Sequence, residues 1–313
     1  MENGLDVINI YFSTDKNYFS KCIIAITSML ENHKSAEKLS VHILTSDLGE
    51  EESKIAQSLA QKYNASIDFV QIDKKQFEIY TKEQNMKYLS INAFYRFFIP
   101  SVAPDECKKA VYLDCDLIVT GDISELYNQV IEEYKAGVIE DKMAKQQIKT
   151  LSLKGDKYFN SGVLLLNIEE LRKTDFLRET VDYFNKNFEI IEFHDQDILN
   201  GIWDNQVKFL DERFNAQSHS FLRMKKRYKL AGVTRIDNPV IIHYTGSVKP
   251  WQINCIHKRA LDWLKYQQMT IYKLSDFQVL LFKIKRFLTR IAYINYKNSK
   301  LFISLFGMKL YQG

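Results

Sequence analysis

Short apolar runs alternate with stretches of helical periodicity in the first part of the chain. Residues 7–12 form a mostly apolar run typical of a buried strand, and residues 19–32 then repeat apolar side chains at three- and four-residue intervals, as a helix does. The same alternation predicts strands at 41–44 and 67–70, with a helix around Ile55, Leu59 and Tyr63 between them. This βαβαβ order predicts an α/β fold with a mostly parallel central sheet.

Polar residues at the ends of two predicted strands are the first candidates for function. Ser13, Asp15 and Asn17 follow the first strand, and Asp114 and Asp116 follow the apolar run 110–113. Ligands of open α/β sheets bind at the carboxyl ends of the strands, so these positions carry more weight than polar residues elsewhere.

The pair Asp114 and Asp116 offers two carboxylates near one strand end. Mg²⁺ and Mn²⁺ prefer oxygen ligands and often combine one or two carboxylates with the phosphate oxygens of a nucleotide. Taken alone, the pair is more typical of a turn, in which Asp116 caps the turn and Asp114 is solvated.

The acid pair belongs to a larger set of ordered motifs. The segment 113–119, with 121–123 and 126–127 after it, resembles the metal-site strand of the family 8 retaining glycosyltransferases, which include glycogenin and bacterial lipopolysaccharide galactosyl- and glucosyltransferases. The likeness continues through 158–167, 194–200 and 243–251, and so spans about the first 260 residues. It implies a GT-A type, Rossmann-like nucleotide-sugar-binding domain.

The resemblance also implies a metal site. Asp114, Asp116 and His243 are expected to ligate a divalent cation, Mn²⁺ or Mg²⁺, that bridges the diphosphate of a UDP-sugar donor. An imidazole added to two carboxylates favours manganese. Without the family, His243 after the apolar residues 240–242 is more typical of a hydrogen-bonded structural histidine.

Family positions further imply the donor-binding residues Lys249 and Gly246 at the diphosphate, and Asp15 and Asn17 at the uridine. A lysine supplies a point charge, and a glycine permits close approach of the backbone to a phosphate. The alternatives are a surface lysine beside a turn glycine, and capping of the helix that begins near Phe19.

Arg96 matches a family arginine near the donor sugar and diphosphate, with an ordinary surface salt bridge as its alternative. Asn160, Asp195 and Gln196 match positions around the transferred sugar, whose hydroxyls need fixed donors and acceptors. Asp195 and Gln196 also suit the first turn of a helix. We hypothesise that Gln196 lies near the anomeric carbon and that Asp195 binds sugar hydroxyls.

Together these residues predict a metal-dependent hexosyltransferase that moves glucose or galactose from a UDP-sugar to an acceptor glycan or glycolipid, such as lipopolysaccharide or another surface glycan. The family implies retention of anomeric configuration, through either a covalent intermediate or same-face attack. Either Glu140 or Asp141 is expected to face the sugar. A haloacid-dehalogenase-like phosphatase with Asp114 as nucleophile is the rival enzyme, but its motif normally ends the first strand.

Charge and cysteine usage refine this picture. Residues 276–313 hold seven basic side chains and one acid, so the net charge of +4 leaves about −2 for the rest of the chain. That balance disfavours the remaining alternative, a non-enzymatic, basic-tailed nucleic-acid binder. The acidic start at Glu2 and Asp6 is unlike a signal peptide, and four irregularly spaced cysteines suit free thiols in the cytoplasm.

The tail has a helical pattern of its own. Apolar residues recur at helical spacing from Phe277 to Ile291 among basic residues, which predicts a basic amphipathic helix. We therefore divide the chain into a glycosyltransferase domain, 1–265, and a basic, aromatic helical tail, 266–313. No apolar run reaches the roughly 18 residues of a membrane span, so the tail is expected to bind an anionic membrane surface, at the inner face of the plasma membrane. The alternative is a helix docked on the protein's own core.

Overall fold

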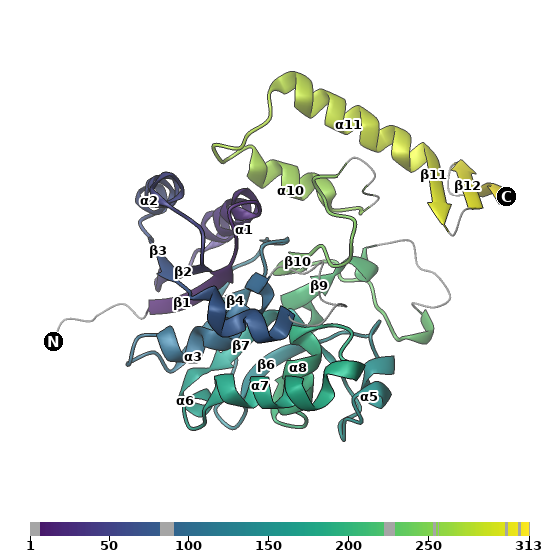
Figure 1. Ribbon diagram of the computed structural model, residues 1–313. Helices are drawn as coiled ribbons and strands as arrows, with labels where there is room; N and C mark the ends of the chain where they lie inside the picture. The colour runs from purple at the N-terminus through teal and green to yellow at the C-terminus, as the bar shows by residue number, and fades with distance from the viewer. Residues whose placement is uncertain are drawn as a thin grey trace.

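A seven-stranded sheet forms the centre of the protein (Figure 1). The computed structural model describes residues 7–81, 91–221, 229–252, 255, 257–297, 300–305 and 308–312. The sheet order is β3 (Ser66–Gln71), β2 (Lys38–Thr45), β1 (Val7–Ser13), β4 (Lys109–Leu113), β7 (Phe159–Asn167), β6 (Ala136–Glu140) and β8 (Val207–Phe209). Strand β7 is antiparallel to β4 and β6, and the other neighbouring pairs are parallel. The predicted α/β fold with a mostly parallel sheet is confirmed.

The first helices follow the predicted pattern. Helix α1 (Phe19–Asn32) has the predicted bounds and buries its apolar face against the sheet. Helix α2 (Glu50–Tyr63) begins where the Glu52 carboxylate accepts a hydrogen bond from the backbone N–H of Gly49 at 3.0 Å. It ends at Asn64, whose φ of 51° is left-handed and stops the helix.

Two layers of helices enclose the sheet (Figure 1). Helices α1 and α2 cover one face, and α7 (Phe176–Asn187) and α8 (Asp195–Ile202) cover the other. On that second face, the 3₁₀ segments η1 (Lys74–Thr81) and η3 (Ile91–Phe98) add an aromatic layer in which Tyr80 stacks on Phe94 with ring centroids 4.6 Å apart. These aromatic rings pack together in the hydrophobic core on this face of the sheet.

A small second sheet joins distant parts of the chain. It consists of β5 (Leu117–Val119), β10 (Ile241–His243) and β9 (Ala216–Gln217), and its residues are all buried. Antiparallel pairing sets His243 opposite Leu117. The register therefore places the histidine beside the residue that follows Asp116.

Short helices complete the body of the protein. They are α3 (Ile99–Val102), α4 (Ser124–Tyr127), α5 (Gln146–Thr150), α6 (Ile168–Leu171), η4 (Phe188–Ile190), η5 (Glu212–Asn215) and η6 (Ser218–Ser220). The four cysteines, Cys22, Cys107, Cys115 and Cys255, are free thiols and buried.

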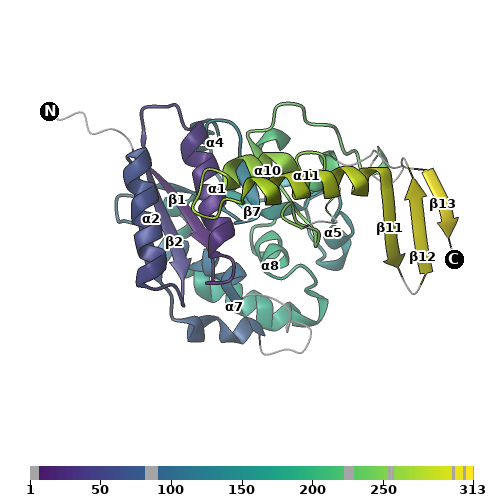
Figure 2. The same cartoon turned by 90° about the horizontal axis from the view of Figure 1, so that it is seen from above.

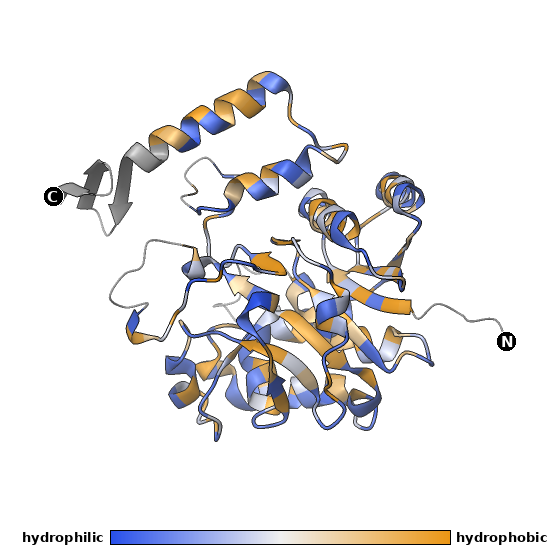
Figure 3. Cartoon of the chain, turned by 180° about the vertical axis from the view of Figure 1, so that it is seen from behind, coloured by the Kyte–Doolittle hydropathy of each residue, from blue (hydrophilic) through white to orange (hydrophobic). Residues whose placement is uncertain are grey.

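The C-terminal segment combines helices with strands. Helix α10 (Ala260–Gln267) packs on α1, where the amide of Asn32 donates to the Tyr266 hydroxyl at 2.8 Å. Helix α11 (Asp276–Ile291) lies farther from the sheet than α10 (Figure 1). It is amphipathic, with apolar and polar residues interleaved along it (Figure 3), as the sequence predicts. A meander of β11 (Ala292–Lys297), β12 (Lys300–Leu305) and β13 (Met308–Gln312) follows it (Figure 2).

The helical prediction for the tail thus holds over α11 and not beyond Ile291. Aromatic and β-branched residues are frequent after that point and favour a pleated strand over a helix. The division into domains 1–265 and 266–313 remains a prediction, and its boundary falls within α10. Among the described residues, no helix is both long and apolar enough to cross a bilayer.

Candidate functional site

The candidate site lies at the carboxyl end of the central sheet, where β4 gives way to β5. The backbone N–H of Asp114 donates to the Gly162 carbonyl on β7 at 2.9 Å, and the N–H of Tyr244 donates to the Asp116 carbonyl at 3.0 Å. Backbone hydrogen bonds to β7 and to the residue after β10 therefore fix the positions of the two acids. The pairing of β5 with β10 adds His243 from more than 100 residues away in the sequence.

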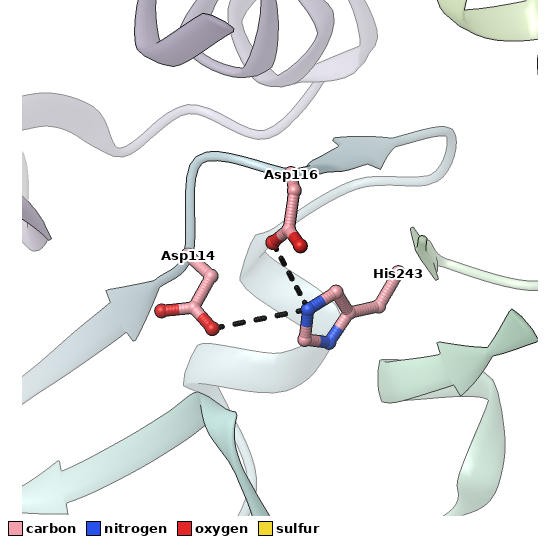
Figure 4. Close-up of side chains that lie close together, drawn as sticks. All are labelled: Asp114, Asp116 and His243. Carbon is pink, nitrogen blue, oxygen red and sulfur yellow. Dashed lines mark hydrogen bonds and ion pairs between the residues drawn. The ribbon is translucent and has the colours of Figure 1, made fainter. Parts of the chain in front are cut away.

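The side chains of Asp114, Asp116 and His243 point toward one another (Figure 4). His243 Nε2 lies 3.1 Å from Asp116 Oδ1 and 3.8 Å from Asp114 Oδ2, and the three potential ligand atoms lie within 4.8 Å of one another. Ligands about 2.1 Å from a shared ion lie roughly 3–4 Å apart. The donor set and its spacing fit a divalent cation such as Mn²⁺ or Mg²⁺.

Close approach of these groups depends on Gly162. A Cβ atom at this position would lie 2.3 Å from His243 Cε1 and 2.4 Å from Asp114 Oδ2. Contacts that short do not occur between non-bonded atoms, so any side chain at this position would displace the histidine or the carboxylate. Glycine is therefore required in this strand by space rather than by backbone conformation.

Two cations neutralise the acid pair. The Lys249 ammonium pairs with Asp116 Oδ2 and donates to the Tyr244 carbonyl at 2.9 Å, and Arg96 Nη2 donates to Asp114 Oδ1 at 3.0 Å. Burial alone would raise the pKa of the Asp116 carboxyl, but Lys249 and His243 hold that pKa well below its usual range. Asp116 is thus ionised and ready to bind a cation.

Arg96 is the buried centre of the site. It is 5% exposed, donates to the Ser161 carbonyl at 2.6 Å, and stacks its guanidinium over the Tyr112 ring with 4.3 Å to the centroid. Its Nη1 also lies 3.1 Å from Asp195 Oδ2. Burial disfavours the charged guanidinium, but Asp195, Tyr112 and Asp114 more than offset this and raise the pKa of Arg96. The surface salt bridge considered for Arg96 is therefore wrong.

Asp195 is a buried acid at the N-terminus of α8. Burial raises the pKa of its carboxyl from 3.8 to about 6, even though the neighbouring Arg96 lowers it. Its Oδ2 atom is buried, and its contact with Arg96 lacks the geometry of a hydrogen bond. That oxygen is therefore held by its ion pair with Arg96 rather than by a hydrogen bond.

Gln196 is bound through its amide oxygen. Its Oε1 accepts hydrogen bonds from Asn160 Nδ2 at 2.9 Å and from the backbone N–H of Ser161 at 3.1 Å, while its Nε2 lies 3.4 Å from Asp141 Oδ2. Glu140 instead forms an ion pair with Lys145. Of the two acids at the end of β6, Asp141 is therefore the one that contacts Gln196, and burial raises the pKa of its carboxyl.

Most of the proposed site residues line one cavity of about 420 Å³. Ten of the residues singled out in the sequence line it: Ser13, Asp15, Arg96, Asp114, Asp116, Asn160, Asp195, Gln196, His243 and Gly246. Lys249 reaches this group through Asp116, whereas Asn17 is exposed and does not line the cavity. Asp15 also accepts a hydrogen bond from the backbone N–H of Tyr18 at 2.9 Å, so capping and cavity lining occur together.

The cavity also has lining residues that the sequence did not single out. They are Thr14, Tyr18, Asn92, Ala93, Tyr112, Cys115, Ser161 and Thr245. Thr14, Cys115, Ser161 and Thr245 each adjoin a residue of a recognised motif, so proximity in sequence could have indicated them. Tyr18, Asn92 and Tyr112 carry no such signal, because an aromatic or amide residue near a strand or helix is usually structural.

Solved structures share this fold. A galactosyltransferase LgtC in complex with donor and acceptor sugar analogues aligns with a TM-score of 0.75 and 23% identity, over 87% of this chain and 99% of that one. The glycosyltransferase GlyE of Streptococcus pneumoniae aligns with a TM-score of 0.64 and 24% identity, over 88% of this chain and 63% of that one. At these identities the likeness concerns the fold.

Sequence comparison identifies the family. General stress protein A of Bacillus subtilis is 27% identical over 85% of this chain and 94% of its own length, and a lipopolysaccharide 1,2-glucosyltransferase of Escherichia coli is 28% identical over 89% and 81%. A lipopolysaccharide 1,3-galactosyltransferase of Salmonella typhimurium is 28% identical over 79% and 73%. The sequence profile of glycosyl transferase family 8 matches residues 9–255, which contain the acid pair, the histidine and the cavity. The chain therefore belongs to glycosyltransferase family 8.

Proposed function

We propose that this glycosyltransferase transfers a hexose, glucose or galactose, from a UDP-sugar to a hydroxyl group of an acceptor glycan, with retention of configuration. The convergence of Asp114, Asp116 and His243 on one point is the observation that carries the proposal. The lipopolysaccharide glucosyl- and galactosyltransferases among its relatives support a hexose donor and a bacterial surface glycan as acceptor. The phosphatase alternative, with Asp114 as nucleophile, has no support from these relatives.

The three ligands are proposed to hold Mn²⁺, or Mg²⁺ in its place. When bound, the cation neutralises the charge that develops on the diphosphate leaving group. Lys249, which pairs with Asp116, is assigned a share of that task, and Gly246, with no described atom but its chain neighbours within 4 Å of where a Cβ would lie, leaves room for a phosphate. Ser13 and Asp15, which line the cavity, are assigned to the uridine, whereas the exposed Asn17 lies outside the cavity.

The sugar is proposed to occupy the part of the cavity lined by Asn160, Asp195 and Gln196. The Asp195 carboxylate, which lines the cavity, suits a sugar hydroxyl, and its ion pair with Arg96 keeps it oriented. The Gln196 oxygen already accepts two hydrogen bonds, so the amide enters the site in one fixed orientation beside Asp141. Gln196 is assigned to the neighbourhood of the anomeric carbon.

Release of UDP from a panel of UDP-sugars, with and without Mn²⁺, tests donor, metal and reaction together. We expect metal-dependent release with UDP-glucose or UDP-galactose, and a loss of more than about 100-fold in Asp116→Asn, beyond the 10- to 100-fold typical of supporting residues. Asp237→Asn changes an exposed acid and serves as the control. Equal release in the presence of a chelator would contradict the metal assignment.

Substitution of Gln196 and Asp195 tests the sugar site. Gln196→Ala and Asp195→Ala are expected to lower kcat by about 100-fold or more while UDP binding changes little, because these residues contact the transferred sugar rather than the nucleotide. Isothermal titration with UDP and steady-state kinetics separate the two effects. Full turnover in either variant would refute its assigned role.

The tail is proposed to attach the enzyme to the anionic inner face of the plasma membrane. Helix α11 exposes large apolar side chains, with Phe277 72% and Phe287 63% exposed, next to Lys283 and Lys285. Exposed apolar residues flanked by lysines are typical of helices that lie in a lipid interface. Arg286 instead turns inward and donates to the His257 carbonyl at 2.7 Å, which fixes the helix on the body.

Co-sedimentation with anionic vesicles tests this attachment. The full chain is expected to sediment with the vesicles, whereas Phe277→Asp/Phe287→Asp and a chain that ends at residue 275 are expected to remain in solution. Neutral vesicles provide the control for the contribution of charge. Equal sedimentation of the full and shortened chains would contradict the proposal.

A further inference from the structure

Behind the candidate metal site lies Asn215, a buried amide at the end of η5 that is 1% exposed. Its Oδ1 lies 3.0 Å from His243 Nδ1. In Figure 4, this ring nitrogen is the one turned away from Asp114 and Asp116. Its Nδ2 donates to Asn160 Oδ1 at 2.9 Å. Asn215 therefore connects the histidine to the residues assigned to the sugar.

Backbone groups determine how these amides are oriented. The N–H of Gly162 donates to Asn160 Oδ1 at 3.1 Å, and the N–H of Ser161 donates to Gln196 Oε1 at 3.1 Å. A backbone N–H can only donate, so each of these contacts identifies an amide oxygen without ambiguity. Asn160 Nδ2 then completes the pattern by donating to Gln196 Oε1 at 2.9 Å.

The orientation of Asn160 has a consequence for His243. Because the Asn160 oxygen faces Asn215, the Asn215 NH₂ group must face Asn160, and the Asn215 oxygen must face His243 Nδ1. An oxygen accepts but does not donate, so Nδ1 must carry the hydrogen that lies between them. The lone pair of a neutral His243 is then left on Nε2, which faces Asp114 and Asp116.

We propose that Asn215 is a positioning residue that keeps the proton of His243 on Nδ1, so that Nε2 is directed to the cation shared with Asp114 and Asp116. This inference rests on the proposed metal site. Hydrogen bonds to the second ring nitrogen commonly fix the tautomer and orientation of metal-binding histidines. Without Asn215, the acceptors that the described residues place beside the ring are the two carboxylates at Nε2, which favour a proton at the ligating atom.

Binding of Mn²⁺ in the presence of UDP, followed by the electron paramagnetic resonance signal of free Mn²⁺, tests the proposal. Asn215→Leu removes the acceptor at similar volume and is expected to weaken Mn²⁺ binding by about 10- to 100-fold. Asn215→Asp keeps an acceptor beside Nδ1 and is expected to bind Mn²⁺ more tightly than Asn215→Leu. Asn167→Leu, which alters a buried asparagine at the far end of β7, should lose stability but not Mn²⁺ affinity.

Nitrogen NMR of labelled histidines supplies a second readout that does not depend on the metal. At mildly alkaline pH, the metal-free wild-type protein is expected to show the Nδ1–H form of His243, identified by its absence in His243→Gln. A neutral His243 with its proton on Nε2 and none on Nδ1 would overturn the proposal even if Asn215→Leu fails to fold.

The metal site and the role of Asn215 are refuted by different results. Failure of the wild-type protein to bind Mn²⁺ would refute the proposed metal site itself. Tight binding by the wild type and by Asn215→Leu alike would refute the role of Asn215 alone.

Discussion

Asp195 is expected to reduce the stability of the fold that contains it. Its carboxyl has a pKa of about 6 in the folded protein, raised by burial from 3.8. This rise in pKa means that ionising the carboxyl costs about 3 kcal/mol more in the folded protein than in the unfolded chain. Asp195→Asn removes that ionisation and should stabilise the protein by up to about 3 kcal/mol at neutral pH, while it abolishes the proposed contact with the sugar.

The sign of the pH dependence follows from proton binding. Between pH 3.8 and about pH 6 the folded protein retains the Asp195 proton that the unfolded chain has lost. Wild-type stability therefore falls, relative to Asp195→Asn, as the pH rises through this window. The advantage of the variant should be absent below the window and complete above it.

Urea unfolding of both proteins at a series of pH values, in the presence of a chelator, measures this difference. Asp237→Asn reports the background effect of removing one exposed acid. A difference between wild type and Asp195→Asn that stays constant across the window would refute the reasoning. So would an Asp195→Asn variant that is less stable than wild type at neutral pH.

Two further predictions concern the metal site. Lys249→Met should weaken UDP binding by about 10- to 100-fold, because a charged hydrogen bond to the diphosphate is lost. The same variant should bind Mn²⁺ alone more tightly, because Asp116 loses the lysine that competes with the cation. Calorimetric titration with UDP and with Mn²⁺ measures the two effects separately. Gly162→Ala should reduce Mn²⁺ affinity and turnover by at least about 10-fold, since the new Cβ would lie 2.3 Å from His243, whereas Gly49→Ala, with its nearest contact at 3.7 Å, should leave both unchanged.

The sequence predicted well those parts of the fold in which the spacing of apolar residues is compatible with only one kind of element. Helix α1 occupies the predicted residues 19–32, because its apolar spacing can fit only a helix packed on one face. The direction of β7 could not be predicted in this way. Its residues are buried throughout, and such a strand has the same pattern whether it runs parallel or antiparallel to its neighbours.

Some residues of the candidate site could be predicted from the sequence and others could not. Acids after an apolar strand carry a chemical signal, and the recognised motifs added His243 and Gln196. Asn215 carries no such signal, because a single asparagine after Phe214 resembles any turn residue. Its importance arises from two long-range contacts, one 28 residues and one 55 residues away in sequence, which only the folded chain creates.

Charge balance explains why these acids can be buried together. Asp114, Asp116 and Asp195 converge at one cavity, and their mutual repulsion would oppose folding if no cation were present. Arg96 is buried between Asp114 and Asp195 by contacts from several directions, so it is a permanent partner. Lys249 is held from the segment after β10 by Asp116 and one carbonyl, so under the proposed function it would be able to move to a diphosphate if a divalent cation took its place. The same exchange that completes the proposed donor site would then keep the acids neutralised at every stage.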